Sequence, residues 1–338
     1  MPAPARRAFR AFRAFRAFRV LRALAGATLA IGALAVCERS RESPPPDTAV
    51  VTSPPPPAPP DSAAPAVGWD PTVGTALFVA GSGPREAVVV FPQFSDSTLT
   101  DTTTFDLASV QSVPVELFSR TGRVGRAQLQ SPAPPAHSAA ECTAWPTARV
   151  TGGPTARRDA TAGPNAPWMV AFAAGHATAI PLDSIEDDPP ADSAKLAADV
   201  TRLAAALPDA APDFRAIPFM VRTARRFSPE PGVDAVVGQL VRTVNQEANP
   251  REEQTIVIGE RPAGKPGARY LPAYHERSEG PEETIETSDV LAAVRLGPTA
   301  TPTLVLARDY GDGMAYALVE RTGPAAWRLR WSSAYAGC

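Results

Sequence analysis

Ten prolines between residues 38 and 67 divide this chain into a stretch that cannot form a core and a longer one that can. The proline runs at 44–46 and 54–57 fix φ and remove backbone donors, so they favour an extended, polyproline-like spacer over a packed domain. Fully extended, such a spacer reaches about 90 Å at roughly 3.1 Å per residue. The remaining residues, 68–338, suffice for one large domain or two medium ones.

The first 36 residues have the composition of a secretory signal. The stretch from Arg6 to Arg22 carries seven arginines and no acidic residue, and residues 23–36 are largely apolar. As a helix, that apolar stretch would span roughly 21 Å at about 1.5 Å per residue, less than the roughly 30 Å hydrocarbon core of a bilayer. We therefore expect a signal peptide over residues 1–36 rather than a permanent transmembrane helix. Translation from Met1 and translation from Val20 both remain open.

The apolar stretch ends in Leu34-Ala35-Val36-Cys37. This segment resembles the lipobox of bacterial lipoproteins, in which the cysteine is diacylated on its sulfur and becomes the first residue of the mature chain. Leu34 and Ala35 match that motif, whereas Val36 departs from it, because Gly, Ala or Ser usually precedes the cysteine. The resemblance implies lipidation of Cys37, which would hold the chain far more firmly than a single acyl chain does. Ordinary signal cleavage or an uncleaved anchor is the alternative.

The residue after Cys37 bears on the destination that the resemblance implies. In lipoproteins of bacteria with two membranes, an aspartate at that position favours retention in the inner membrane, and here the residue is Glu38. The resemblance therefore implies a bacterial cell-envelope protein in the outer membrane, facing the periplasm or the exterior. Its membrane contact would be the N-terminal lipid, and other envelope proteins are candidate partners.

The charge of the chain excludes one class of partner. Without the signal, 26 basic residues stand against 35 acidic ones, a net formal charge of −9. A domain of this charge lacks the cationic surface that phosphate contacts require, so we expect no nucleic-acid partner. It would also be repelled by an anionic bilayer, which suits a domain held off the membrane by a spacer.

Beyond Cys37 the chain has two further cysteines, Cys142 and Cys338. In an oxidising compartment two remaining cysteines most simply form one disulfide, which here would close a loop of nearly 200 residues. In the chain-entropy model a loop of that size adds about 5 kcal/mol to stability. Two free thiols or pairing between chains are the alternatives. Neither cysteine has a Cys or His neighbour at ligand spacing, so we predict no metal site.

Strand patterns dominate both ends of the folded region. Segment 113–118 leads through a Gly-containing turn into 124–129, which predicts a hairpin, and 168–172 with 177–182 predicts another around His176. Near the C-terminus, 303–307, 314–320 and 327–335 predict a three-stranded meander. In its last strand Trp327, Trp331 and Tyr335 alternate with polar residues, which predicts one packed and one wet face.

Two segments carry apolar residues at helical spacing. Residues 192–207 form the first, which predicts an amphipathic helix. Asp192 or Ser193 can cap its N-terminus, and Pro208 ends it. A second helix is predicted over 233–248, where one stripe is formed by Val236, Val237, Leu240, Val241 and Val244.

These elements predict an α+β fold in which two amphipathic helices pack on an antiparallel β-sheet or meander, preceded by a β-rich N-terminal part. The predicted divisions are residues 1–36 for the signal peptide, 37–67 for the lipid-anchored proline-rich linker, 68–190 for the β-rich part and 191–338 for the helices and sheet.

The histidines point to no catalytic constellation. His137 lies in a Pro/Ala loop, His176 in a turn and His275 at an alternating strand position, and each position favours a structural or solvated role. A triad of His176 with Asp183 and Ser184 has no support beyond closeness in sequence, because no nucleophile-elbow motif is present.

Acidic and aromatic clusters are equally unspecific. Residues 309–313 resemble a calcium loop only superficially, since they lack its closing glutamate, and a hairpin turn explains them better. The glutamates of 279–286 are typical of a solvated loop. Trp327, Trp331 and Tyr335 could form a carbohydrate or peptide platform, although sheet core explains such aromatics better. Gly81-Ser82-Gly83 lacks the length and the lysine of a phosphate loop, and we predict no cofactor.

The sequence therefore favours a non-enzymatic, lipid-anchored envelope protein with a binding or structural role. One alternative is an envelope hydrolase acting on wall polymer, peptide or ester through carboxylates that the sequence does not single out. Another is a component of an envelope assembly or transport machine.

Overall fold

A computed structural model describes residues 77–81, 85–90, 111–133, 145–153, 168–208, 212–244, 250–265, 267–333 and 335–337. All of these residues fall within one compact unit, Ser62–Cys338. The predicted signal, the linker and the three cysteines Cys37, Cys142 and Cys338 lie outside the described residues.

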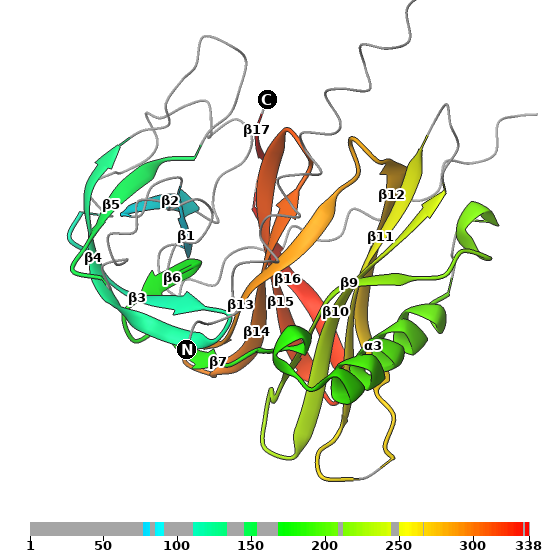
Figure 1. Ribbon diagram of the computed structural model, residues 1–338. Helices are drawn as coiled ribbons and strands as arrows, with labels where there is room; N and C mark the ends of the chain where they lie inside the picture. The colour runs from blue at the N-terminus through cyan, green and yellow to red at the C-terminus, as the bar shows by residue number, and fades with distance from the viewer. Residues whose placement is uncertain are drawn as a thin grey trace, which may run out of the picture. The chain divides into compact units, whose positions relative to one another are not determined.

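The first strands form a closed, antiparallel barrel whose order is β1-β2-β5-β4-β3-β6 (Figure 1). Its strands are β1 (Leu77–Ala80), β2 (Glu86–Val90), β3 (Pro114–Ser119), β4 (Gly122–Ala133), β5 (Thr147–Thr151) and β6 (Val170–Ala173). Side chains such as Phe78, Leu117 and Leu129 fill the interior and are fully buried. The predicted hairpin over 113–129 is confirmed as β3 and β4, which pair antiparallel with one register shift between Leu117 and Phe118.

Two antiparallel sheets follow the barrel. The five-stranded sheet has the order β12-β11-β10-β9-β8 and the six-stranded sheet the order β16-β15-β14-β13-β7, with β17 paired to β15. The strands of the first are β8 (Asp183–Ser184), β9 (Met220–Phe227), β10 (Val233–Val244), β11 (Arg251–Pro262) and β12 (Leu271–Pro281). Those of the second are β7 (Ala177–Ile180), β13 (Thr287–Leu296), β14 (Thr301–Asp309), β15 (Gly313–Gly323), β16 (Ala326–Ser332) and β17 (Ala336–Gly337).

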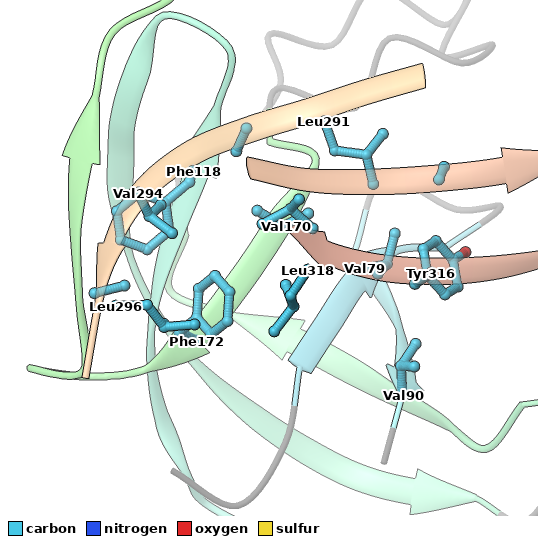
Figure 2. Close-up of a cluster of buried hydrophobic side chains, with 14 of the residues drawn as sticks. Val79, Val90, Phe118, Val170, Phe172, Leu291, Val294, Leu296, Tyr316 and Leu318 are labelled. Carbon is cyan, nitrogen blue, oxygen red and sulfur yellow. The ribbon is translucent and has the colours of Figure 1, made fainter. Parts of the chain in front are cut away.

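The six-stranded sheet is apolar on both faces. Along β14, Leu304 and Leu306 pack against the five-stranded sheet, whereas Val305 and Ala307 join a cluster with barrel residues. Figure 2 shows this second cluster, in which Phe118 and other barrel side chains lie among residues of β13 and β15. The unit is therefore layered as barrel, six-stranded sheet and five-stranded sheet.

A helix supplies the last layer. The α-helix α3 (Pro190–Ala205) follows the short 3-10 helix η4 (Ile185–Asp187) and covers the outer face of the five-stranded sheet (Figure 1). A second 3-10 helix, η5 (Pro212–Phe214), precedes β9. The helix starts at Pro190, before the expected cap, and Ser193 Oγ donates a hydrogen bond to the Ile185 carbonyl at 2.7 Å. None of the described helices has the length and apolarity that a membrane crossing needs.

The predicted α+β fold with two amphipathic helices is wrong, because the described chain is mostly strand and the described part of segment 233–248 is not helical. Residues 233–244 of it form β10. Val236 and Leu240 face α3, whereas Ala235 and Val237 face the six-stranded sheet. A strand buried on both faces loses its alternation, and its apolar residues then also match a helical stripe. The valines favoured the strand, because β-branched side chains suit strands better than helices.

Two further expectations fail for local reasons. The segments around His176 do not pair with each other: β6 pairs with β1 and β3 in the barrel, whereas β7 pairs with β13. In β16, Trp331 pairs with Leu318 but Leu329 pairs with Val319, so one extra residue interrupts the register. This bulge places Trp331 in the barrel-facing cluster and Trp327 in the core between the sheets, so the two do not share one face as expected. Both are buried, which agrees with the favoured sheet core and not with the alternative of an aromatic platform.

Two glycines let α3 approach the five-stranded sheet closely. A Cβ added to Gly238 would lie 2.1 Å from Cγ1 of Val200, and one added to Gly259 would lie 2.5 Å from Cδ1 of Leu203. Val200 and Leu203 of the helix thus occupy the space into which a side chain at either glycine position would extend.

We expect Gly238→Ala to destabilise the protein by about 1–3 kcal/mol in urea unfolding, because α3 must shift outward. Gly280→Ala on β12 is the matched control, since an added Cβ there meets no described atom within 4 Å, and it should change stability by less than about 0.5 kcal/mol. Combining Gly238→Ala with Val200→Ala should cost less than the sum of the two single changes. Equal costs for Gly238→Ala and Gly280→Ala would contradict this packing.

A buried carboxylate joins the two sheets. Oε1 of Glu260, on β11, accepts hydrogen bonds from Arg321 Nε at 2.7 Å and from Trp327 Nε1 at 2.6 Å. Its Oε2 accepts one from the Ala325 backbone at 2.9 Å. Burial by itself would raise the pKa of Glu260, but these hydrogen bonds and the charge of Arg321 outweigh it and lower the pKa below the ordinary 4.5.

This link predicts a pH-dependent contribution to stability. Because the pKa of Glu260 is lower in the folded chain, its contribution is complete above the unfolded value of 4.5 and is lost as pH falls through the folded value. Glu260→Gln should cost about 3 kcal/mol at neutral pH and much less in strong acid. The control Asp234→Asn removes a pair whose carboxylate is 40% exposed and should cost less than about 1 kcal/mol. A pH-independent loss for Glu260→Gln would refute the mechanism.

Candidate functional site

The cysteines of the predicted disulfide, Cys142 and Cys338, lie outside the described residues, but residues close to each of them do not. Trp145 and Ala336 belong to the same buried cluster. Ala336 pairs with Met314 of β15, and the Trp145 ring lies 6.3 Å from that of Tyr316 on the same strand. The chain segments that lead to the two cysteines therefore converge on β15, and the disulfide remains a prediction.

The histidines occupy separate places. His137 is outside the described residues. His176 lies in the turn between β6 and β7, where its carbonyl accepts a hydrogen bond from Gly297. Asp183 and Ser184 form β8 and pair with β9. His275 lies on β12, where burial and the neighbouring Arg277 lower its pKa.

The acidic clusters also have structural partners. Asp188 accepts two hydrogen bonds from Arg226 Nη2, at 2.6 and 2.8 Å. Asp309 accepts one from the Gly311 backbone at 2.8 Å, within the turn that joins β14 to β15. Across the described residues, no group of three His, Cys, Asp or Glu side chains is placed to hold a metal ion.

A polar cleft opens between the two sheets where their apolar packing ends. Its volume is about 290 Å³, just below the range of about 300–1,000 Å³ that is usual for ligand pockets. We call it the Arg308 cleft. Its lining includes Gln239, Gln254, Ile256, Glu276, Ser278, Glu286, Ser288, Arg308 and Leu329. These residues come from β10, β11, β12, β13, β14, β16 and the segment before β13.

Strand register explains why polar side chains gather there. Arg308 pairs with Ser288 in neighbouring strands and continues the row of Leu304 and Leu306 that faces the five-stranded sheet. Opposite it, Glu276 pairs with Ile256, which packs in the core between the sheets. The cleft is therefore the polar continuation of that core.

Arg308 lies between two carboxylates. Its Nη2 donates a hydrogen bond to Oε1 of Glu276, and its Nε lies 3.4 Å from Oε1 of Glu286. The Arg308 side chain is only 11% exposed, and those of the two glutamates are about one quarter exposed. The pair with Glu276 joins β14 to β12, so it connects the two sheets across the cleft.

Two tyrosines complete the network. Tyr274 donates a hydrogen bond to Glu276, and burial together with that carboxylate raises the pKa of Tyr274. Burial, followed by the charge and hydrogen bonding of Glu286, raises the pKa of Tyr310 to about 12. Both phenols therefore stay protonated at neutral pH and act as donors to the carboxylates.

Two buried atoms of this network have no hydrogen-bond partner among the described residues: Oε2 of Glu276 and Nε of Arg308. Buried polar atoms are nearly always hydrogen-bonded, so an acceptor and a donor left together beside an open cleft indicate a place for a polar molecule. Arg277 borders the cleft, but its guanidinium group lies at the Pro208 carbonyl and near Glu253, on the other face of the sheet. The two unpartnered atoms suit a polar ligand that both donates and accepts hydrogen bonds.

Sequence reasoning missed this site. It treated Glu286 as part of a solvated loop, and it singled out neither Glu276 nor Arg308. Two signals were available. Gln239 interrupts the apolar run of β10, and Arg308 follows directly on the apolar run of β14. Neither signal shows by itself that the two strands face each other.

Comparison with protein-family models, with curated protein sequences and with solved structures yields no match for this chain. The function has to be argued from the site itself.

Replacing Arg308 with methionine should destabilise the protein by about 2 kcal/mol or more, because Glu276 and Glu286 lose their cation while mostly buried. Adding Glu276→Gln to Arg308→Met should recover part of that loss, which a double-mutant cycle in urea measures. The control Arg328→Met removes a pair whose arginine is 61% exposed and should cost less than about 1 kcal/mol. Additive effects of the Arg308 and Glu276 changes would contradict the network.

Proposed function

We propose that this protein is an exported bacterial lipoprotein, held in the outer membrane by acyl chains on Cys37, whose β domain binds a small polar ligand in the Arg308 cleft. The role is binding rather than catalysis. The lipobox-like segment supports the anchor, and the polar cleft between the sheets supports the binding role.

Several features agree with an envelope location. The spacer of residues 38–67 would hold the domain away from a membrane whose charge has the same sign as its own. The segments leading to Cys142 and Cys338 converge on β15, which supports a disulfide of the kind that oxidising compartments allow. Other envelope proteins are the proposed macromolecular partners, and nucleic acid is not.

The observation that carries the binding role is the pair of unsatisfied atoms, Glu276 Oε2 and Arg308 Nε. The donor and acceptor lie in one network, and a ligand that offers both functions would satisfy them. Gln239, Gln254, Ser278 and Ser288 line the same cleft. This set matches a sugar hydroxyl array or the ammonium and carboxylate of an amino acid.

The anchor is tested by the mature protein from native membranes. We expect acyl groups on Cys37 as the first residue in its mass spectrum, and we expect Cys37→Ser to accumulate as an unacylated precursor. Unacylated mature protein that remains membrane-bound would refute this part of the proposal. Alkylation of the same sample with and without reduction tests the predicted pairing of Cys142 with Cys338.

The binding role is tested by calorimetric titration of the full-length protein with a panel of free amino acids, monosaccharides and disaccharides. We expect at least one class to bind, and Arg308→Met to weaken that binding at least tenfold, since hydrogen bonds to charged groups are the strong ones. Arg328→Met should bind normally. No binding by any member, or equal binding by Arg308→Met, would contradict the proposed site.

One observation favours a hydrolase as the second candidate: Glu276 and Glu286 face one cleft, and paired carboxylates are the usual equipment of glycoside hydrolysis. The same panel extended to wall glycans and esters decides between the two. Turnover abolished by both Glu276→Gln and Glu286→Gln would establish the hydrolase, whereas binding without turnover supports the first proposal.

A further inference from the structure

A second pocket lies on the other face of the five-stranded sheet. It has a volume of about 640 Å³ and lies between the C-terminal end of α3, the segment after η5 and the edge of the sheet. We call it the α3 groove. Its lining includes Ala205, Leu207, Ile217, Phe219, Arg242 and Arg277. Its walls are largely apolar and its floor carries guanidinium groups.

The floor holds more positive than negative charge. Arg242 and Glu253 form a pair in which Nη2 of Arg242 lies 2.6 and 2.7 Å from the two carboxylate oxygens. Arg277 Nε lies 3.5 Å from the same carboxylate. The Arg242 side chain is 4% exposed, that of Glu253 is 0% exposed and that of Arg277 is 13% exposed. Two buried cations therefore share one buried anion, an arrangement that is costly unless a further anion is present.

Arg277 is the incompletely satisfied member. Arg242 donates to both Glu253 oxygens and, through Nη1, to the Phe214 carbonyl at 2.7 Å. Arg277 donates through Nη1 to the Pro208 carbonyl at 2.9 Å, but its buried Nε has no hydrogen-bond partner in the part of the chain that the structure describes. Glu253 also accepts from Thr255, so its oxygens are already in use.

The apolar wall restricts what the missing anion can be. Phe219 lies against the Arg242 guanidinium, with its ring centroid 4.2 Å from Cζ, and so covers the polar floor on that side. Leu207 and Ile217 line the groove above it. A free inorganic anion would leave these apolar surfaces in contact with water. An anion that continues into an apolar chain would cover them and gain from their burial.

We propose that the α3 groove binds a free fatty acid, with its carboxylate at Arg277 and its acyl chain along Leu207, Ile217 and Phe219. A carboxylate matches the planar donor geometry of a guanidinium group and can accept two hydrogen bonds from it. This site is distinct from the Arg308 cleft, which lies on the opposite face of the sheet, although Arg277 reaches the border of both pockets.

The test uses membranes that carry the full-length protein, and a laurate analogue with a photoactivatable group on its chain as the probe. Irradiation followed by peptide mass spectrometry locates the label. We expect label on residues 201–219, displaced by unlabelled laurate or octanoate but not by dodecanol or dodecyltrimethylammonium. Label elsewhere, or equal displacement by dodecanol, would overturn the proposal, because the first denies the site and the second denies the carboxylate.

Two variants test separately the charge of Arg277 and the open space of the α3 groove. Arg277→Met should raise the octanoate concentration that halves labelling at least tenfold. Ala205→Phe keeps every charge but fills the groove from an exposed helix position, and it should abolish labelling even if Arg277→Met folds poorly. The matched control Arg222→Met, at an exposed position of β9, should leave labelling unchanged. Unchanged labelling in Ala205→Phe would overturn the proposal independently of any result at the Arg308 cleft.

Discussion

The six-stranded sheet, buried on both faces, is the constraint on which the rest of the structure depends. A strand such as β14 must present apolar side chains in both directions, with Leu304 and Leu306 toward one neighbouring layer and Val305 and Ala307 toward the other. Antiparallel sheets usually have one face in contact with water. This sheet is apolar on both faces, so each face must pack against another layer. The barrel supplies one and the five-stranded sheet the other, which in turn is covered by α3.

Both candidate pockets lie where this apolar layering gives way to charge. Along β14 the row that faces the other sheet continues from Leu306 to Arg308, and the cleft begins there. On the outer face of the five-stranded sheet, the row through Gly238 and Leu240 continues to Arg242, where the cover of α3 ends. In each place a buried guanidinium group lies at the end of a hydrophobic layer, and a buried polar atom there has no hydrogen-bond partner among the residues that the structure describes.

Much of the local structure was predictable from the sequence and most of the tertiary arrangement was not. The β3–β4 hairpin, the β14–β16 meander and α3 follow from local turns and periodicity, because their residues contact sequence neighbours. Strand β10 was mistaken for a helix because both of its faces are buried, and the bulge in β16 separates Trp327 from Trp331. The Arg308 cleft could not be predicted because Glu276 and Arg308 meet only across two sheets, and sequence spacing carries no information about that contact.

The central claim is that the sheets open at Arg308 to hold a polar molecule. The most direct measurement is an experimental structure of the full-length protein taken from its native membranes, at a resolution that shows ordered water. The account predicts a bound molecule larger than water that contacts both Glu276 Oε2 and Arg308 Nε. A cleft in which those two atoms bind each other, or bind ordered water alone, would contradict it.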